Sequence, residues 1–164
     1  MIETERLLLR RPTEADVESP PAWLSDPEVM DWLGGIAEPP AEVVQLWLAQ
    51  WELFPSGKFL IELRSDGAVV GRVGANYYDP RTWRRSADGE PELGWALGRE
   101  HWGHGYATEA ALAVRDWLQA PRVISLIAPD NLRSQQVAQR LGAHPEQTVE
   151  LPGHGPHLVW VHPR

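Results

Sequence analysis

A glycine-rich turn between an apolar strand pattern and a helical pattern is the segment best suited to bind a ligand. It spans residues 102–107 and reads Trp-Gly-His-Gly-Tyr-Ala. Glycine lets the backbone approach a ligand closely. The first turn of a following helix offers free N–H groups and a partial positive charge. Together these features predict a site for an anion, most naturally a phosphate.

Two common nucleotide motifs do not fit this turn. A dinucleotide fingerprint that starts at Gly103 needs glycine or alanine at position 108, where the chain has Thr108. The Gly-Lys-Ser/Thr sequence of nucleotide-hydrolase phosphate loops occurs nowhere in the chain. From the residues alone, a phosphate site and a purely structural strand-to-helix turn therefore stay equally open.

The other reactive residue types narrow the chemistry. There is no cysteine, which excludes disulfides, thiolate metal sites and cysteine nucleophiles. His154, His157 and His162 lie in a segment rich in proline and glycine, so we expect turn residues that could titrate near neutrality. The spacing of these histidines does not support a metal site.

The elements that must position these residues alternate along the chain. Helical patterns cover 40–54, 105–118 and 131–141, with shorter helices after Thr13 and after Asp26, the latter ending near Gly34-Gly35. Strand patterns cover 5–11, 59–63, 69–78, 92–97, 123–128 and 158–161, with one more around Val149. This order predicts an α/β fold with a mixed sheet, in one domain over residues 1–164.

The amino-acid composition limits the kinds of partner that the protein can bind. The formal net charge is −8, which repels nucleic acid and anionic lipid and mildly attracts a cationic partner such as an amine, or serves solubility alone. No stretch reaches the about 18 apolar residues of a membrane helix. The first residues lack a secretory pattern, so we expect a cytoplasmic protein.

Four segments, in the correct order, resemble the GCN5-related N-acetyltransferase (GNAT) superfamily, and specifically its ribosomal-protein acetyltransferase-like (RimJ/RimL-type) branch. The superfamily's coenzyme motif, Gln/Arg-x-x-Gly-x-Gly/Ala, matches residues 102–107, with Trp102 in place of Gln or Arg. The other matching segments are 4–10, 92–95 and 131–143. The resemblance implies a mostly antiparallel mixed sheet with a splayed central parallel strand pair, flanked by helices.

The resemblance also implies a coenzyme site and the absence of a metal. Acetyl-CoA would be the cosubstrate, with its pyrophosphate on the backbone amides of the glycine-rich turn and its pantetheine arm along the strand before that turn. Asn131, in the Asn-x-x-Ser segment, belongs to the same cleft. The implied coenzyme-binding residues are Trp95, Ala96, Leu97, Trp102, Gly103, His104, Gly105, Tyr106, Ala107 and Asn131.

In this family the amine attacks the thioester directly, and two proton transfers accompany the attack. The tyrosine that often protonates the sulfur would fall at Ala138, and Ser134 is the implied donor instead. Glu92 is the favoured base, directly or through water, with Glu150 as a weaker candidate. The plainer alternatives are that Ser134 is only a first-turn helix residue and that Glu92 is a solvated strand residue.

The acceptor is expected to be a protein N-terminus or a small-molecule amine. It would be selected by residues 23–54 and 79–89, and neither nucleic acid nor membrane is an expected partner. A homodimer is a further expectation, because dimers are common in this branch. The competing function is a CoA-binding regulatory module that has lost catalysis, which the missing tyrosine at Ala138 keeps open.

Overall fold

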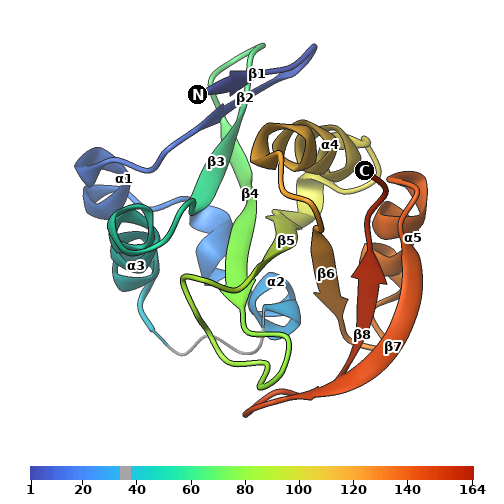
Figure 1. Ribbon diagram of the computed structural model, residues 1–164. Coiled ribbons are helices and arrows are strands. Elements are labelled where there is room, and N and C mark those ends of the chain that lie inside the picture. The colour runs from blue at the N-terminus through green and yellow to red at the C-terminus, as the bar shows by residue number, and fades with distance from the viewer. Residues whose placement is uncertain (34–37) are drawn as a thin grey trace.

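One mixed sheet organises the computed structural model, which describes residues 1–33 and 38–164. Its strand order in this described part is β1-β2-β3-β4-β5-β6-β8-β7 (Figure 1). All neighbouring pairs are antiparallel except β5 and β6. The strands are β1 (Ile2–Glu3), β2 (Leu7–Arg10), β3 (Lys58–Leu63), β4 (Val69–Tyr78), β5 (Glu90–Leu97), β6 (Ile124–Ile127), β7 (His144–Leu151) and β8 (Gly155–Val161).

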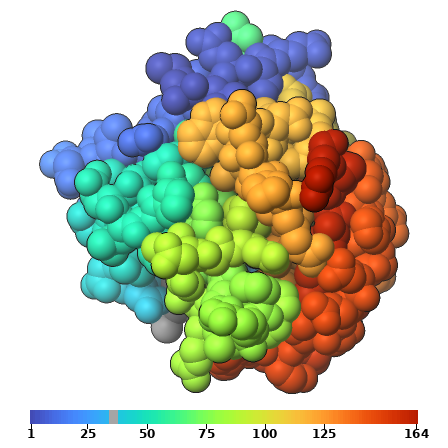
Figure 2. Space-filling view, viewed as in Figure 1, coloured from blue at the N-terminus to red at the C-terminus, as the bar shows by residue number. Residues whose placement is uncertain are grey.

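Helices cover both faces of the sheet. Small residues of α4, Ala110 and Ala111, pack with Phe59, Ile61 and Leu93 in the main core. On the opposite face, α2 and α3 form a second core around Leu60 of β3. The space-filling view places α4, in gold, beside the orange and red C-terminal strands (Figure 2). The helices are α1 (Glu14–Glu18), α2 (Pro27–Trp32), α3 (Pro40–Leu53), α4 (Tyr106–Leu118) and α5 (Leu132–Arg140).

The parallel pair is splayed. β5 and β6 share a single register pair, Glu92 with Ile124, and then part. Where the two strands begin to part, two hydrogen bonds that involve side chains join β5 and β6 in place of backbone hydrogen bonds. The Ser125 hydroxyl donates to the carbonyl of Leu93, and the amide of Leu126 donates to Glu92 Oε1 at 3.4 Å. The predicted mixed sheet with a splayed parallel pair is confirmed.

The sequence located the helices well and the edge strands poorly. The predicted helices at 40–54, 105–118 and 131–141 correspond to α3, α4 and α5. Strand β1 was not expected, and β7 begins at His144, well before the strand predicted around Val149. The predicted end of α2 near Gly34-Gly35 lies outside the described residues.

The expectation for the C-terminal histidines is wrong at two positions. His157 lies within strand β8, not in a turn. His162 is 4% exposed, and burial lowers its pKa to about 4. Because the protonated ring would have to shed its water to stay buried, His162 is neutral at physiological pH. Within the described ranges, no helix is long and apolar enough to cross a bilayer.

Candidate active site

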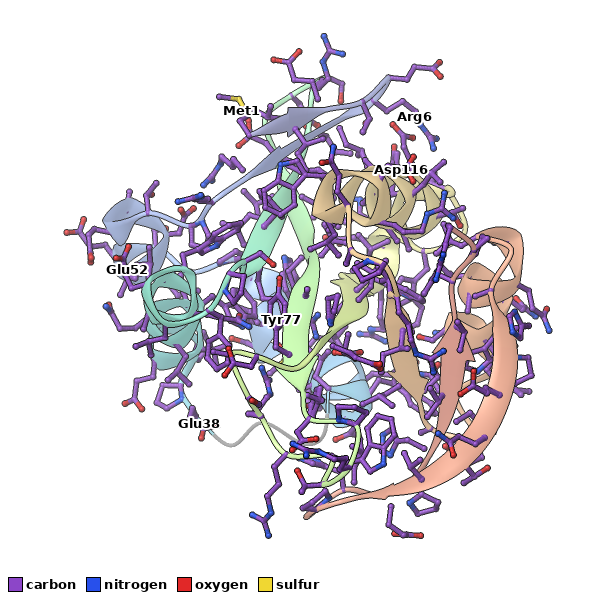
Figure 3. All side chains as sticks on the ribbon, in the orientation of Figure 1. Met1, Arg6, Glu38, Glu52, Tyr77 and Asp116 are labelled. Carbon is purple, nitrogen blue, oxygen red and sulfur yellow. The ribbon has the colours of Figure 1, made fainter. Side chains whose placement is uncertain are left out.

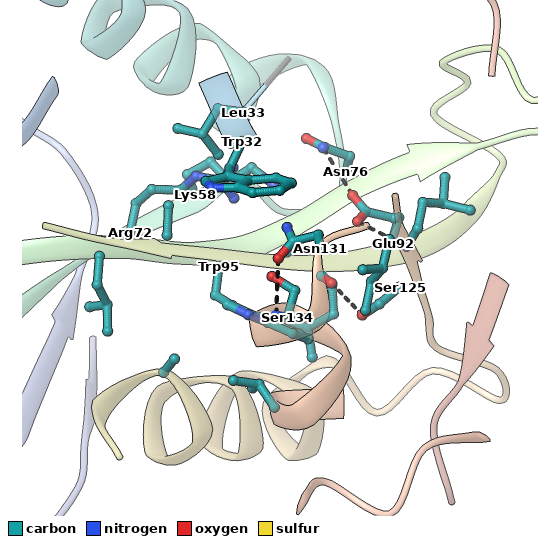
Figure 4. A pocket seen from close by; sticks show the side chains of 18 of the residues that line it. Trp32, Leu33, Lys58, Arg72, Asn76, Glu92, Trp95, Ser125, Asn131 and Ser134 are labelled. Carbon is teal, nitrogen blue, oxygen red and sulfur yellow. Dashed lines mark hydrogen bonds between the residues drawn. The ribbon is translucent and has the colours of Figure 1, made fainter. Parts of the chain in front are cut away.

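A cavity of about 1310 Å³ gathers almost every residue that the sequence singled out. Helices α2 and α3 form one wall of the cavity. Strand β5, the start of α4 and helix α5 form the opposite wall. The close view shows Trp32 and Leu33 above the strands and Ser134 below them (Figure 4). The predicted residues in its lining are Glu92, Trp95, Ala96, Leu97, Trp102, Gly103, Gly105, Tyr106, Ala107, Asn131 and Ser134.

The glycine-rich turn enters α4 through two left-handed residues. Gly103 has φ 79° and Gly105, the N-cap of α4, has φ 80°. Such angles are costly for residues with a Cβ, which explains both glycines. A Cβ on Gly103 would meet no atom within 4 Å, so the turn is open on that side. Thr108 Oγ1, one turn on, is buried without a hydrogen-bond partner among the described residues.

The turn is held in place by the N-terminal segment. Glu109, in the first turn of α4, accepts hydrogen bonds from Thr4 Oγ1 at 2.6 Å and from Arg6 Nε at 2.7 Å. Arg6 also donates to the carbonyl of His104 at 2.8 Å. Figure 3 shows Arg6 on the same side of the molecule as α4. The backbone of the turn is therefore fixed before any ligand arrives.

His104 differs from its neighbours in the turn. Its ring stacks on Tyr106 with the centroids 5.5 Å apart. It does not line the main cavity but a shallow depression beside it, shared with Glu5 and Glu109. Gly103, Gly105 and Thr108 line the same depression, so the ring of His104 lies beside the turn but outside the main cavity.

Arginines from α5 supply positive charge near the turn. The Arg133 guanidinium lies 3.9 Å from the ring centroid of Trp102, and Arg140 also lines the cavity. Trp102 is itself fixed, because its indole N–H donates to the carbonyl of Leu97 at 2.9 Å. An open glycine turn, a helix N-terminus, a spare Thr108 hydroxyl and two arginines fit the diphosphate of a coenzyme A thioester.

Strand β5 offers the second part of such a site. Past the pair at Glu92, the edge of β5 that faces β6 has no strand partner in the described part of the chain. Trp95, Ala96 and Leu97 lie along this stretch and line the cavity. Free backbone groups at a strand edge can hydrogen-bond an extended amide-containing ligand, as a pantetheine arm is.

Glu92 lies at the vertex of the splay. Its side chain is 8% exposed, so the reading of Glu92 as a solvated strand residue is wrong. Besides the amide of Leu126, its carboxylate accepts a hydrogen bond from Asn76 Nδ2 at 3.1 Å. Glu150, the weaker candidate base, lies exposed on edge strand β7 and outside the cavity lining.

Helix α5 begins at the Asn131 cap. Asn131 Oδ1 accepts a hydrogen bond from the amide of Ser134 at 3.1 Å, which orients the first turn of the helix. Ser134 lies in that turn, as the structural reading expects, and it also lines the cavity. Its role as a proton donor stays a prediction. Ala138 is fully buried and packs with Ile127 and Trp160.

Sequence reasoning missed several polar residues of the cavity. Lys58, Arg72 and Asn76 line it from β3 and β4, and Ser125 lines it from β6. The sequence of β4 did contain a signal for a shared polar face, because the alternation of side chains along a strand places Arg72, Gly74 and Asn76 on one face. In the residues that the structure describes, no cluster of three His, Asp or Glu side chains could hold a metal ion.

Comparisons with known proteins agree on one family. Residues 6–144 match the model of the acetyltransferase (GNAT) domain. The chain is 27% identical over 151 residues to the uncharacterized N-acetyltransferase p20 of Bacillus licheniformis, covering 87% of this chain and 82% of that protein.

Solved structures show the same fold. An acetyltransferase from Agrobacterium tumefaciens str. C58 superposes with a TM-score of 0.80 at 32% identity, covering 99% of this chain and 94% of that one. RimL, a ribosomal alpha-N-protein acetyltransferase solved with coenzyme A, superposes with a TM-score of 0.74 at 17% identity, covering 97% and 94%. At that identity the second match shows the fold alone.

Proposed function

The chain belongs to the GNAT acetyltransferase family, and on this premise we propose that it transfers the acetyl group of acetyl-CoA to a primary amine. One observation carries the proposal. A single cavity joins the open glycine turn to the splayed strands, with Glu92 at their vertex. The phosphate end and the reacting end of one extended thioester would therefore have separate places in it.

The coenzyme-binding residues have complementary tasks. Backbone amides of residues 103–107 would hold the pyrophosphate, and the charges of Arg133 and Arg140 would offset its negative charge. The free edge of residues 95–97 would bind the pantetheine arm. A strand N–H aimed at the thioester carbonyl stabilises the developing oxyanion, a contribution of about 2.7–4 kcal/mol in measured cases of acyl transfer.

The chemistry needs one C–N bond to form, one C–S bond to break and a proton to move at each end. Glu92 would accept the proton that the amine loses, and Ser134 would donate a proton to the departing sulfur. Burial of Glu92 in the cavity places it where an amine could approach from the side of α2 and α3. A protein α-amine has a pKa of about 7.7–8.0 and needs little help from a base.

The proposal extends to the branch and the acceptor. The segments at 102–107 and 131–143 favour a RimJ/RimL-type enzyme, with a protein N-terminal amine or a small-molecule amine as acceptor. The acidic net charge of −8 favours either kind of amine over an anionic macromolecule. Use of acetyl-CoA favours a cytoplasmic location.

The test is acetyl-CoA consumption with a panel of peptide and small-molecule amines, run on the unmodified chain and on Ser134→Ala. We expect turnover with at least one amine, and a kcat about 10–100-fold lower in the variant with unchanged coenzyme affinity by calorimetry. A variant with full kcat would remove Ser134 from the proton transfer.

The same assay separates the competing function. Tight binding of coenzyme A without acetylation of any amine in the panel would identify a regulatory CoA-binding module. The alternative stays open because Ala138 occupies the position where the family's usual tyrosine would lie. Failure to bind coenzyme A at all would overturn both functions.

A further inference from the structure

Two basic side chains, Lys58 and Arg72, lie close together in the lining of the cavity. Lys58 of β3 is 3% exposed and donates a hydrogen bond to the carbonyl of Gly74 at 3.1 Å. Burial and the charge of Arg72 hold the pKa of Lys58 well below its usual value. Arg72 of β4 lies next to it on the same face of the sheet. Both side chains line the cavity, and Figure 4 labels them to the left of Trp32. They form the cation floor of the site.

Arg72 is the unusual member of the cation floor. Its Nε and Nη1 atoms are buried and have no hydrogen-bond partner among the described residues. Burial lowers the pKa of Arg72 to about 10, which still leaves the guanidinium charged at neutral pH. A buried charged donor without a partner is costly, and such groups are normally paired. Arg72 therefore lacks an anion.

Glu92 does not supply that anion. Its carboxylate is already used by Asn76 Nδ2 and by the amide of Leu126. Across the parts of the chain that the structure describes, no ion pair joins Arg72 to Glu92. Glu92 therefore acts on Arg72 through its charge alone, which raises the pKa of Arg72, whereas burial and the charge of Arg85 lower that pKa.

Gly94 lies between the two groups. A Cβ on Gly94 would lie 3.3 Å from Arg72 Nη1 and 3.4 Å from Glu92 Oε1. The guanidinium and the carboxylate therefore flank the same position of β5, and a ligand that reaches both places one group beside each. The two protein charges are opposite, so their natural ligand carries both signs a few bonds apart.

We propose that the acetyl acceptor is an amine with a carboxylate close to its nitrogen, as in a free α-amino acid, and that Arg72 binds this carboxylate. The proposal rests on the proposed acetyltransferase function and names its substrate class. Guanidinium and carboxylate form paired, charge-assisted hydrogen bonds. With the carboxylate on Arg72, the adjacent ammonium is directed toward Glu92. A bound carboxylate would also favour the protonated form of Lys58, whose pKa burial and the charge of Arg72 lower.

The lining of the cavity carries charges of both signs. Glu28, Glu38 and Asp130 line it together with Arg72, Arg133 and Arg140, and Glu28 is paired with Arg99. Because Arg72 is the buried cation with unpaired donors, it would select molecules that carry an anion. A diamine or an aminoglycoside-like polycation would leave Arg72 unpaired, which disfavours it.

The experiment compares free leucine with leucinamide and 3-methylbutylamine as acceptors. These compounds share a side chain and differ only at the carboxylate. We expect kcat/KM for leucine to exceed that for leucinamide by about 10–150-fold, the range for losing one charge-assisted hydrogen-bonded pair. The same panel is run with other amino acids and their amides, so that side-chain preference does not decide the result.

Variants assign the preference to Arg72. Arg72→Gln should lower kcat/KM for the amino acid by a similar factor, mostly through KM, and should lower the value for the amide much less. Arg72→Lys should restore part of the preference. Arg11→Gln, at an exposed arginine outside both the cavity lining and the acceptor-selecting segments, is the matched control and should change neither value. Equal losses for amino acid and amide would show that Arg72 is only structural, and would overturn the proposal.

Failure of the inference and failure of the proposed function give different results. If amides or simple amines are acetylated as well as amino acids, the substrate class is wrong and the acetyltransferase function stands. If no amine is acetylated, calorimetry of leucine and leucinamide with coenzyme A present decides the inference. Selective binding of leucine that Arg72→Gln abolishes would support it, and equal or absent binding would overturn it.

Discussion

At the scale of single residues, Glu92 shows what the sequence could and could not reveal. Its place near the start of a strand marked it as a candidate base, but its burial and its two hydrogen-bond donors depend on the pairing of β5 with β4 and β6. Arg72, by contrast, was not predicted to be a site residue at all. A single arginine in a strand pattern is typical of a solvated face, and only the register shows that it faces a cavity.

The two candidate bases can be compared directly. Glu92→Gln keeps the shape of the side chain and removes its basicity, so we expect kcat to fall about 10²–10⁴-fold with little change in coenzyme affinity. Steady-state kinetics and calorimetry measure the two quantities. Glu150→Gln, on the exposed face of β7, should be indistinguishable from the unmodified chain. If Glu150→Gln lowered kcat and Glu92→Gln did not, Glu150 would be the base.

At the scale of elements, periodic segments were predictable and polar edges were not. The apolar spacing of α3, α4 and α5 identifies them, because each buries one face. Strand β7 has no such pattern, since most of its residues are exposed and its register with β8 shifts between Pro145 and Gln147. The splay between β5 and β6 depends on contacts between distant segments, and only the family resemblance indicated it.

The glycine turn gives a prediction at this scale. Gly105→Val would force a β-branched residue to adopt φ 80° and would crowd the start of α4. We expect coenzyme A affinity to fall by at least tenfold in a chain that still folds, measured by calorimetry with circular dichroism as the check on folding.

A matched control separates strain from ligand contact. Gly67 also has a left-handed φ, 76°, in the turn between β3 and β4, and a Cβ there meets nothing within 4 Å. Gly67→Val should lower stability through the same strain without changing coenzyme affinity. Equal affinity in both variants would place the turn at 103–107 outside the coenzyme site.

At the scale of the whole molecule, stability depends on groups far from the ligand. His162 Nε2 lies 2.9 Å from the Ser125 hydroxyl, which also bonds the carbonyl of Leu93, so the three link β8, β6 and β5. The pKa of His162 is lowered to about 4 by burial and by the charge of Arg115. The folded state therefore requires a neutral ring.

The sign of the pH effect follows from this shift. Between about pH 6.5 and pH 4 the unfolded chain binds a proton at His162 that the folded chain refuses, so stability falls as the pH falls through this range. We expect this residue to account for a loss of about 2 kcal/mol between pH 7 and pH 5. Urea unfolding at both values measures it.

His162→Gln provides the comparison. The variant should be less stable at pH 7 and should lose less of its stability on going to pH 5. An identical loss in the variant and the unmodified chain would mean that another group causes the pH dependence. The predicted homodimer is a separate matter for sedimentation at several protein concentrations, and it stays a prediction.

The link from Thr4 and Arg6 to Glu109 has a practical consequence for anyone who handles this protein. Residues 4–6 and the proposed phosphate site share one carboxylate, although about a hundred residues separate them in the chain. A purification tag, a fusion partner or a short deletion upstream of Leu7 would therefore change how firmly that site is set. Differences in coenzyme affinity between preparations should be traced first to how that segment was made.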